Sequence, residues 1–143
     1  MTVKSILDQK GRDVVTLDPG ATVAQAAQLL GSRRIGAVVV TRGDRKIAGI
    51  LSERDIVRAL AERGAEALVL TVDKVMTAKV STCREANTVN EVMEVMTRGR
   101  FRHLPVEMDG QLDGIVSIGD VVKRRIEEVE REAAQIREYI ATA

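Results

Sequence analysis

The feature that most constrains the fold of this chain is an internal repeat with an offset of 66 residues, from Thr22 to Thr88. Thr22-Val23 recurs as Thr88-Val89, and apolar residues follow each pair at spacings of three and four. Such spacings predict the buried face of an amphipathic helix, with each threonine as its N-cap. The 143-residue chain is therefore expected to fold as two related copies of one unit.

Each copy continues with two short apolar segments and a second helix. Residues 35–40 in the first copy and 101–106 in the second are largely apolar, and polar turns follow both. The second turn holds Asp109-Gly110, a strong hairpin signal. We expect an α+β fold with a β-α-β-β-α order in each copy, repeat one over residues 1–70 and repeat two over 71–126. The copies should pack as one module, because a three-stranded sheet with two helices leaves an apolar face uncovered.

Composition narrows the classes of function. Lys plus Arg number 22 and Asp plus Glu number 21, so the chain lacks the basic excess typical of nucleic-acid binding. Its only two aromatic residues, Phe101 and Tyr139, are too few for a surface on which bases stack. Cys83 and His103 are the single cysteine and histidine, and their spacing suits no metal site. The sequence shows neither a nucleophile with a base nor a Gly-rich phosphate loop. It also lacks a signal peptide and an apolar run near the roughly 18 residues of a membrane span. We expect a cytoplasmic protein that is not an enzyme and has no metal, membrane or nucleic-acid partner.

The second helix of each copy begins with the same motif, a glycine followed by Ser-x-x-Asp. The residues are Gly49, Ser52 and Asp55 in the first copy, and Gly114, Ser117 and Asp120 in the second. One such motif is typical of a capping box, in which side chains satisfy backbone donors. Two motifs at matching places also indicate a ligand site. A carboxylate can accept both hydroxyls of a ribose, the serine and the helix N–H groups can bind phosphate, and the glycines would allow close backbone approach.

The repeated order of a Thr-Val helix, an apolar strand and a Gly-h-h-Ser-x-x-Asp helix start resembles a tandem pair of CBS (cystathionine β-synthase) domains, a stand-alone Bateman module. Val75-Met76-Thr77 at the start of the second copy strengthens this resemblance, which extends to about residue 126. The resemblance implies a regulatory, energy-sensing module that binds an adenosine-containing ligand, namely AMP, ADP, ATP, NAD or S-adenosylmethionine, with no obligatory cofactor. It also implies a regulated protein that the sequence does not identify. The alternative is an interaction or scaffold protein with vestigial clefts.

The resemblance further implies two unequal ligand clefts between the repeats. In the first, Ser52 and Asp55 would face Arg102 and His103, two basic residues placed just before Pro105 that would bind phosphate. Protonation of His103 would make that binding sensitive to pH. We therefore expect this cleft to hold a phosphorylated nucleotide more tightly than the other.

In the second cleft, Ser117 and Asp120 would face Gly36 and Ala37, with no cation nearby. This cleft would be roomier and would suit a different adenosine ligand. Three other candidate ligand contacts also have a structural explanation, Thr16 and Thr82 as strand formers and Arg54 as a solvated helix residue. Ile35 is expected to lie against the adenine ring.

The segment after Asp120 contains neither glycine nor proline through Ala143. Its apolar residues alternate spacings of four and three: Val122, Ile126, Val129, Ala133, Ile136 and Ile140. This pattern predicts a heptad seam on an extended C-terminal helix, with residues 127–143 beyond the second repeat. The seam either packs on its own module or pairs with a second copy, and CBS pairs generally form homodimers through their helices. Three heptads are marginal for an independent coiled coil, so we do not expect the tail alone to suffice.

Overall fold

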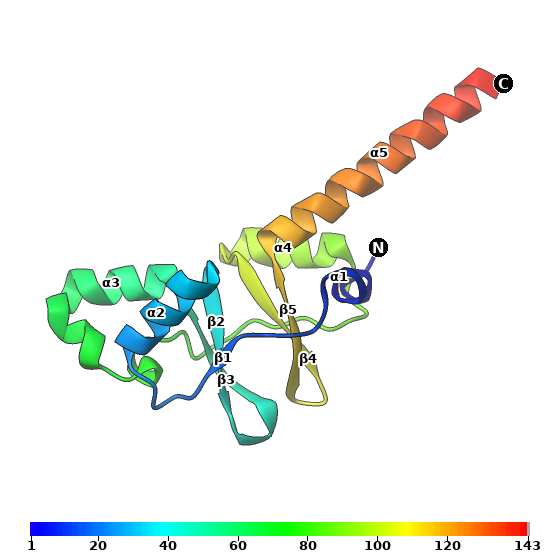
Figure 1. The fold of residues 1–143 in the computed structure, drawn as a ribbon. Helices are drawn as coiled ribbons and strands as arrows, with labels where there is room; N and C mark the ends of the chain where they lie inside the picture. The colour runs from blue at the N-terminus through cyan, green and yellow to red at the C-terminus, as the bar shows by residue number, and fades with distance from the viewer. Residues whose placement is uncertain (143) are drawn as a thin grey trace. The chain divides into compact units, whose positions relative to one another are not determined.

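The computed structural model describes residues 1–142 and shows a mixed α+β fold (Figure 1). In chain order its helices and strands are α1 (Val3–Lys10), β1 (Thr16–Leu17), α2 (Val23–Arg33), β2 (Ala37–Arg42), β3 (Lys46–Ser52), α3 (Glu53–Arg63), α4 (Val89–Gly99), β4 (His103–Met108), β5 (Gln111–Ser117) and α5 (Ile118–Thr142). Short 3-10 turns lie at Gly43–Arg45, Gly64–Val69 and Val72–Lys74. The expected α+β class and the extended C-terminal helix are confirmed.

The strands follow the hydrogen-bonded order β1-β2-β3-β5-β4. β1 pairs with β2 in parallel, and β2 pairs with β3 as an antiparallel hairpin. Asp109 and Gly110, between β4 and β5, have φ values of 51° and 80°. Aspartate and glycine tolerate this left-handed backbone, which two-residue hairpin turns require. The sequence therefore predicted this turn correctly.

The strand expected at Thr82 in the second copy is absent, so this prediction was wrong. In the first copy the Val39 N–H donates to the Val15 carbonyl and helps to hold β1 against β2. Pro105 occupies the place of Val39 in the second copy and has no N–H to donate. The segment consequently keeps only an isolated parallel bridge between Cys83 and Val106.

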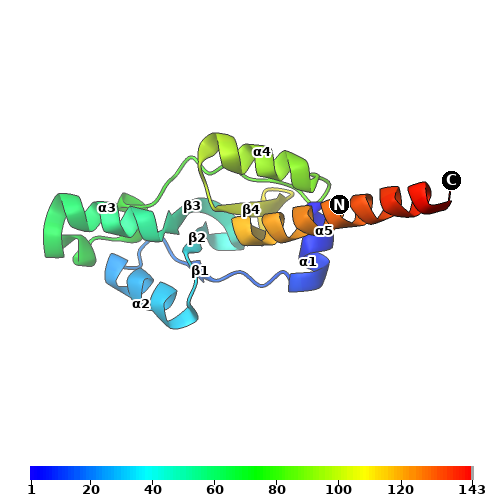
Figure 2. The same cartoon turned by 90° about the horizontal axis from the view of Figure 1, so that it is seen from above.

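The chain forms two compact units, which we call unit 1 and unit 2. Unit 1 consists of Met1–Arg12, Thr82–Val106 and Gly114–Ala143, and unit 2 consists of Asp13–Ser81 and Glu107–Asp113. In unit 1, α1 and α4 both contact α5, and Figure 2 shows α1 crossing α5. In unit 2, α2 and α3 contact each other beside the β2–β3 hairpin.

Each sequence copy begins with a leading segment, Thr2–Leu7 in the first copy and Thr71–Met76 in the second. Each leading segment packs at the start of a helix of the other copy. Thr2 forms an antiparallel bridge with Thr88 at the start of α4, in unit 1. Thr71 forms the matching bridge with Thr22 at the start of α2, in unit 2. The sequence repeat and the compact units therefore divide the chain at different places.

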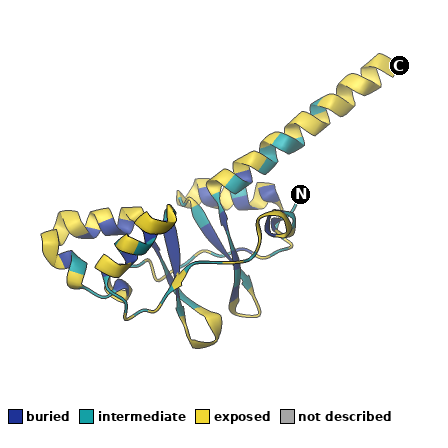
Figure 3. Ribbon diagram, in the orientation of Figure 1, coloured by how far each residue is buried: buried dark blue, intermediate teal, exposed yellow. Residues whose placement is uncertain are grey.

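Each unit has an apolar core on the helix faces that the periodicity predicts (Figure 3). Val23, Ala26 and Leu30 of α2 are buried in unit 2 with Val38, Val40, Leu51, Ile56 and Val72. Val89, Val92 and Met96 of α4 are buried in unit 1 with Val3, Ile6, Leu7, Cys83, Leu104, Val106, Val116 and Val121. These cores hold the starts of α3 and α5, where the two Ser-x-x-Asp motifs lie.

Candidate functional site

The first Ser-x-x-Asp motif forms a reciprocal capping box at the start of α3, in unit 2. The Ser52 N–H donates to Asp55 Oδ2 at 2.9 Å, and the Asp55 N–H donates to Ser52 Oγ at 3.4 Å. Asp55 is only 7% exposed, although it carries a carboxylate. The capping role read from the sequence is therefore present, and it fixes the orientation of the carboxylate.

The second carboxylate oxygen of Asp55 has weaker partners. The Thr77 hydroxyl lies 3.5 Å from Oδ1, and the exposed Arg58 guanidinium lies 3.9 Å from it. Nearby, the carbonyl of Gly36 accepts a hydrogen bond from the Glu53 N–H at 3.0 Å. A carboxylate oxygen can accept more than these long contacts provide, so Asp55 retains acceptor capacity for a ligand.

The second motif forms the same box at the start of α5, in unit 1. The Ser117 N–H donates to Asp120 Oδ2 at 2.8 Å, and the Asp120 N–H donates to Ser117 Oγ at 3.1 Å. The Ile118 N–H donates to the Arg102 carbonyl at 2.7 Å. This bond matches the one from the Glu53 N–H to the Gly36 carbonyl in unit 2. The two helix starts are thus built alike.

Lys10 makes the two helix starts chemically different. Its ammonium group donates to Asp120 Oδ2 at 2.7 Å and to the Ile115 carbonyl at 3.0 Å. Burial acts to raise the pKa of Asp120, but hydrogen bonds from Lys10 and Ser117 and the charge of Lys10 outweigh it and hold that pKa below its ordinary value. The expectation that Asp120 has no cation nearby was wrong, because α1 packs in unit 1 and ends at this carboxylate.

The close approach expected at Gly49 and Gly114 is made by the chain itself. A Cβ on Gly49 would lie 2.5 Å from Met76 Sδ and 2.8 Å from the Thr77 carbonyl oxygen. A Cβ on Gly114 would lie 2.8 Å from Leu7 Cδ2. The two leading segments, rather than open space, therefore occupy these positions.

The remaining candidate residues are distributed over both units. In unit 2, Ile35 and Gly36 directly precede β2, and Ala37 is its first residue, paired with Ser52. Thr16 is exposed on β1 and Arg54 is exposed in the first turn of α3. Thr82, Arg102, His103 and Pro105 belong to unit 1, where Pro105 is buried in β4. The expected facing of Asp55 with Arg102 and His103, and of Asp120 with Gly36 and Ala37, stays a prediction.

Two residues near the motifs, Lys10 and Thr77, were not identified as candidates from the sequence. The matching segments Thr2–Leu7 and Thr71–Met76 carry the signal that could have found them. Each of these segments ends beside a motif glycine. Thr77 follows the second segment directly, and Lys10 lies three residues after Leu7, at the end of α1. Within residues 1–142, no helix is long and apolar enough to cross a membrane.

Comparison with known proteins identifies the same two copies. The CBS domain family model matches residues 3–62 and 72–127. The solved CBS-domain containing protein ATU1752 from Agrobacterium tumefaciens is 51% identical, with a TM-score of 0.84 over 87% of this chain and 99% of that chain. The chain spans 66% and 71% of the lengths of two curated relatives to which it is 35% and 32% identical.

Two further solved structures contain adenosine compounds. The CBS domain protein PAE2072 from Pyrobaculum aerophilum, complexed with AMP, is 30% identical, with a TM-score of 0.75 over 84% of this chain and 89% of that chain. The CBS domain pair of protein MJ0100, in complex with 5′-methylthioadenosine and S-adenosyl-L-methionine, is 26% identical, with a TM-score of 0.79 over 90% of this chain and 98% of that chain.

Proposed function

The chain belongs to the family of CBS-domain proteins, and from this premise we propose that it is a regulatory module that binds adenosine-containing ligands at its two Ser-x-x-Asp helix starts. One observation carries the proposal: the motif occurs twice, each time as a fixed carboxylate beside the N-terminus of a helix. The AMP, S-adenosyl-L-methionine and 5′-methylthioadenosine held by two structural relatives support the ligand class.

The chemistry of each helix start suits a nucleoside. Asp55 and Asp120 accept the ribose hydroxyls, which donate hydrogen bonds to a carboxylate, while Ser52 and Ser117 and the N–H groups of α3 and α5 favour a phosphate or another anionic group. The ligand need not be a nucleotide, since a nucleoside thioether also presents a ribose.

The two helix starts are proposed to differ in affinity. Lys10 already binds Asp120 at 2.7 Å, so a ribose must displace or share that ammonium group. Among residues 1–142, the contacts at Asp55 Oδ1 are the long ones of Thr77 and Arg58. We therefore expect the ribose to bind more tightly at Asp55.

Regulation follows if ligand occupancy changes the population of two conformations. A ligand can do so only when it binds one conformation more tightly than the other. The proposed output is an altered association with a regulated protein, and the proposed compartment is the cytoplasm. AMP, ADP, ATP and NAD remain the proposed candidates, together with S-adenosylmethionine.

The first prediction concerns ligand binding by the whole chain. The melting temperature is measured by calorimetry with AMP, ADP, ATP, NAD, S-adenosylmethionine and 5′-methylthioadenosine. A ligand at about 100 times its dissociation constant stabilises the folded state by roughly 2.7 kcal/mol, which raises the melting temperature on the order of 5–10 °C. Asp55→Asn should reduce this shift more than Asp120→Asn.

Glu91→Gln is the matched control, because Glu91 forms a capping box with Thr88 at the start of α4, outside both motifs. This variant should keep the full shift. A shift that survives in both aspartate variants would contradict binding at these helix starts. The absence of a shift with every compound would favour the alternative, a scaffold protein whose clefts are vestigial.

A further inference from the structure

The last helix carries an apolar stripe that its own unit leaves uncovered. Val122, Ile126, Val129, Ile136 and Ile140 are between 40% and 68% exposed. α5 has 25 residues and is about 37 Å long at 1.5 Å per residue. Its C-terminal half projects away from α1 and α4 (Figure 1), and the family match ends at residue 127. The stripe therefore continues into a part of the helix that the CBS fold does not account for.

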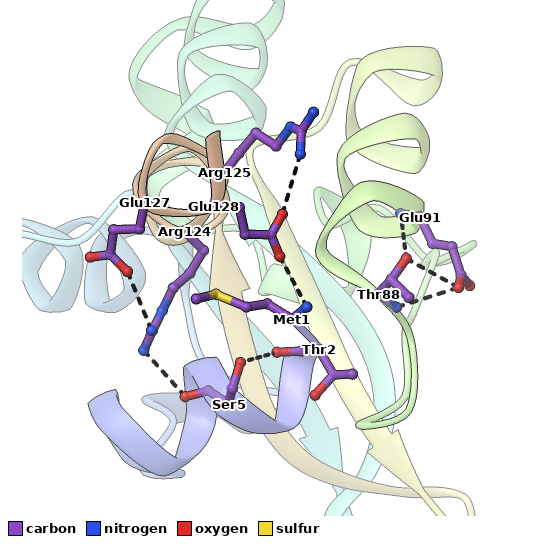
Figure 4. A network of polar contacts seen from close by, with 9 residues as sticks. All are labelled: Met1, Thr2, Ser5, Thr88, Glu91, Arg124, Arg125, Glu127 and Glu128. Carbon is purple, nitrogen blue, oxygen red and sulfur yellow. Dashed lines mark hydrogen bonds and ion pairs between the residues drawn. The ribbon is translucent and has the colours of Figure 1, made fainter. Parts of the chain in front are cut away.

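The contacts that hold α5 lie on a different side of the helix. Arg124 donates to the Ser5 carbonyl at 3.3 Å, and Glu128 pairs with the amino group of Met1 at 3.0 Å (Figure 4). The neighbouring Val121 is fully buried in the core. At 100° per residue, Arg124 and Glu128 lie about 160° and 120° around the helix from Val122, and at least about 80° from every other residue of the stripe. Unit 1 thus fixes the helix while its apolar side stays free.

The stripe has the spacing of a two-stranded coiled coil. Ile126, Ala133 and Ile140 take position a, and Val122, Val129 and Ile136 take position d. Arg124 and Val121 then fall at f and c, which face outward in such a pair. The contacts of these two residues with unit 1 therefore lie outside the a and d seam.

The flanking charges distinguish the two orientations of a pair. Positions e are Lys123, Glu130 and Arg137, and positions g are Arg125, Glu132 and Tyr139. In a parallel pair, each g residue meets the e residue five positions later in the other helix. Arg125 then meets Glu130 and Glu132 meets Arg137, each twice by symmetry, so every charged g–e contact is attractive.

An antiparallel pair in the register that matches a with d brings like charges together. Glu130 would then face Glu130 of the second copy, and Glu132 would face Glu132. Lys123 would face Arg137, which is also repulsive. Like charges at these positions weaken helix pairing.

We infer that α5 is an interaction surface for a second copy of this chain, which it binds as a parallel two-stranded coiled coil through the seam from Val122 to Ile140. Charge complementarity selects this occupant, because the same helix supplies both members of each ion pair. The inference does not depend on ligand binding. Isoleucine and valine at a and d also permit larger parallel bundles, so the number of chains must be measured.

Sedimentation equilibrium of the full chain tests the seam. The wild-type protein should be a dimer, and Ile136→Asp should raise the dissociation constant at least tenfold. Ile136 is 60% exposed and lies beyond the core, so this variant should keep the circular dichroism and melting temperature of unit 1. A trimer or tetramer, or a dimer that Ile136→Asp leaves unchanged, would overturn the inference.

Charge reversal at Arg137 tests the orientation, because the two arrangements predict opposite signs. In a parallel pair Arg137→Glu meets Glu132 and should raise the dissociation constant on the order of tenfold. Adding Glu132→Lys should restore the affinity. In an antiparallel pair Arg137→Glu would meet Lys123 and tighten the dimer, which would refute the parallel arrangement. Arg131→Glu, the same charge change at an outward f position, is the matched control and should have no effect.

An engineered disulfide tests the orientation of the two helices independently. The two Ile140 residues meet in a parallel pair, so Ile140→Cys should form a covalent dimer under mild oxidation. In the antiparallel register residue 140 lies opposite Val122, and no such dimer should form. The native Cys83 is buried, and the wild-type chain under the same oxidation provides the background.

Discussion

At the scale of residues, the two Ser-x-x-Asp motifs could be predicted from the sequence, but the residues that contact them from distant parts of the chain could not. The capping geometry follows from residues three apart, and both boxes form as the spacing predicts. Lys10 reaches Asp120 across 110 residues of chain. No local pattern encodes such a contact, because it depends on where α1 packs.

The Lys10–Asp120 pair predicts a dependence of stability on pH. The folded pKa of Asp120 lies below the ordinary 3.8. A lowered carboxylate pKa stabilises the fold above the ordinary value, and the contribution is lost as the pH falls through the folded value. Lys10→Met should reduce the free energy of unfolding at pH 7 by up to about 1 kcal/mol, because the pair is partly exposed.

Urea titrations of the wild type and Lys10→Met at several pH values measure this difference. It should be constant from neutral pH down to about 5 and should shrink below about 4. Taking the difference between the two proteins removes the contributions of other carboxylates, including Glu91 and Glu128, whose pKa values are also lowered. If the difference in the free energy of unfolding grew as the pH fell, a stabilising ion pair between Lys10 and Asp120 would be contradicted.

At the scale of elements, one residue decides whether a strand forms. The first copy has β1 where the second has a single bridge, and Pro105 in place of Val39 removes the hydrogen-bond donor. The helices were more predictable, because capping residues and a 3.6-residue period specify them locally. The motif glycines belong to this scale as well, since they allow a leading segment to lie against β3 or β5.

Gly49 should not tolerate a side chain, although it sits in a strand where alanine is otherwise acceptable. The Cβ of Gly49→Ala would lie 2.8 Å from the Thr77 carbonyl oxygen, a backbone atom that cannot move aside alone. We expect a loss of about 1–3 kcal/mol in the free energy of unfolding. The control is Gly31→Ala in α2, where no atom lies within 4 Å and helix propensity favours alanine. Equal effects of the two substitutions in urea unfolding would contradict the packing at Gly49.

At the scale of the whole molecule, each unit is built from both sequence copies. α1 belongs to the first copy and completes the core of unit 1, in which Leu7 is 1% exposed. Removal of a buried side chain from Met1–Arg12 should therefore loosen a core that is otherwise made by the second copy. Cys83 reports on that core, because burial raises the pKa of its thiol to about 12 and keeps it unreactive.

Leu7→Ala should accelerate the reaction of Cys83 with a thiol reagent. Removal of the buried side chain destabilises unit 1 by about 2–5 kcal/mol, which populates open states that expose the thiol. The matched variant is Leu51→Ala, which makes the same change at a fully buried position in unit 2. It should accelerate the reaction less. If Leu51→Ala had the larger effect, the assignment of α1 to the core around Cys83 would be wrong.

The sequence alone determined the features that depend on near neighbours: the two copies, the helices with their caps, the Asp109-Gly110 turn, the apolar faces of α2 and α4, and the heptad seam of α5. Tertiary structure decided which leading segment packs with which helix, that Lys10 binds Asp120, and that the α5 stripe stays uncovered. The physical reason is the range of the interactions. Caps and periodicity act over three or four residues, whereas core packing joins segments far apart in the chain.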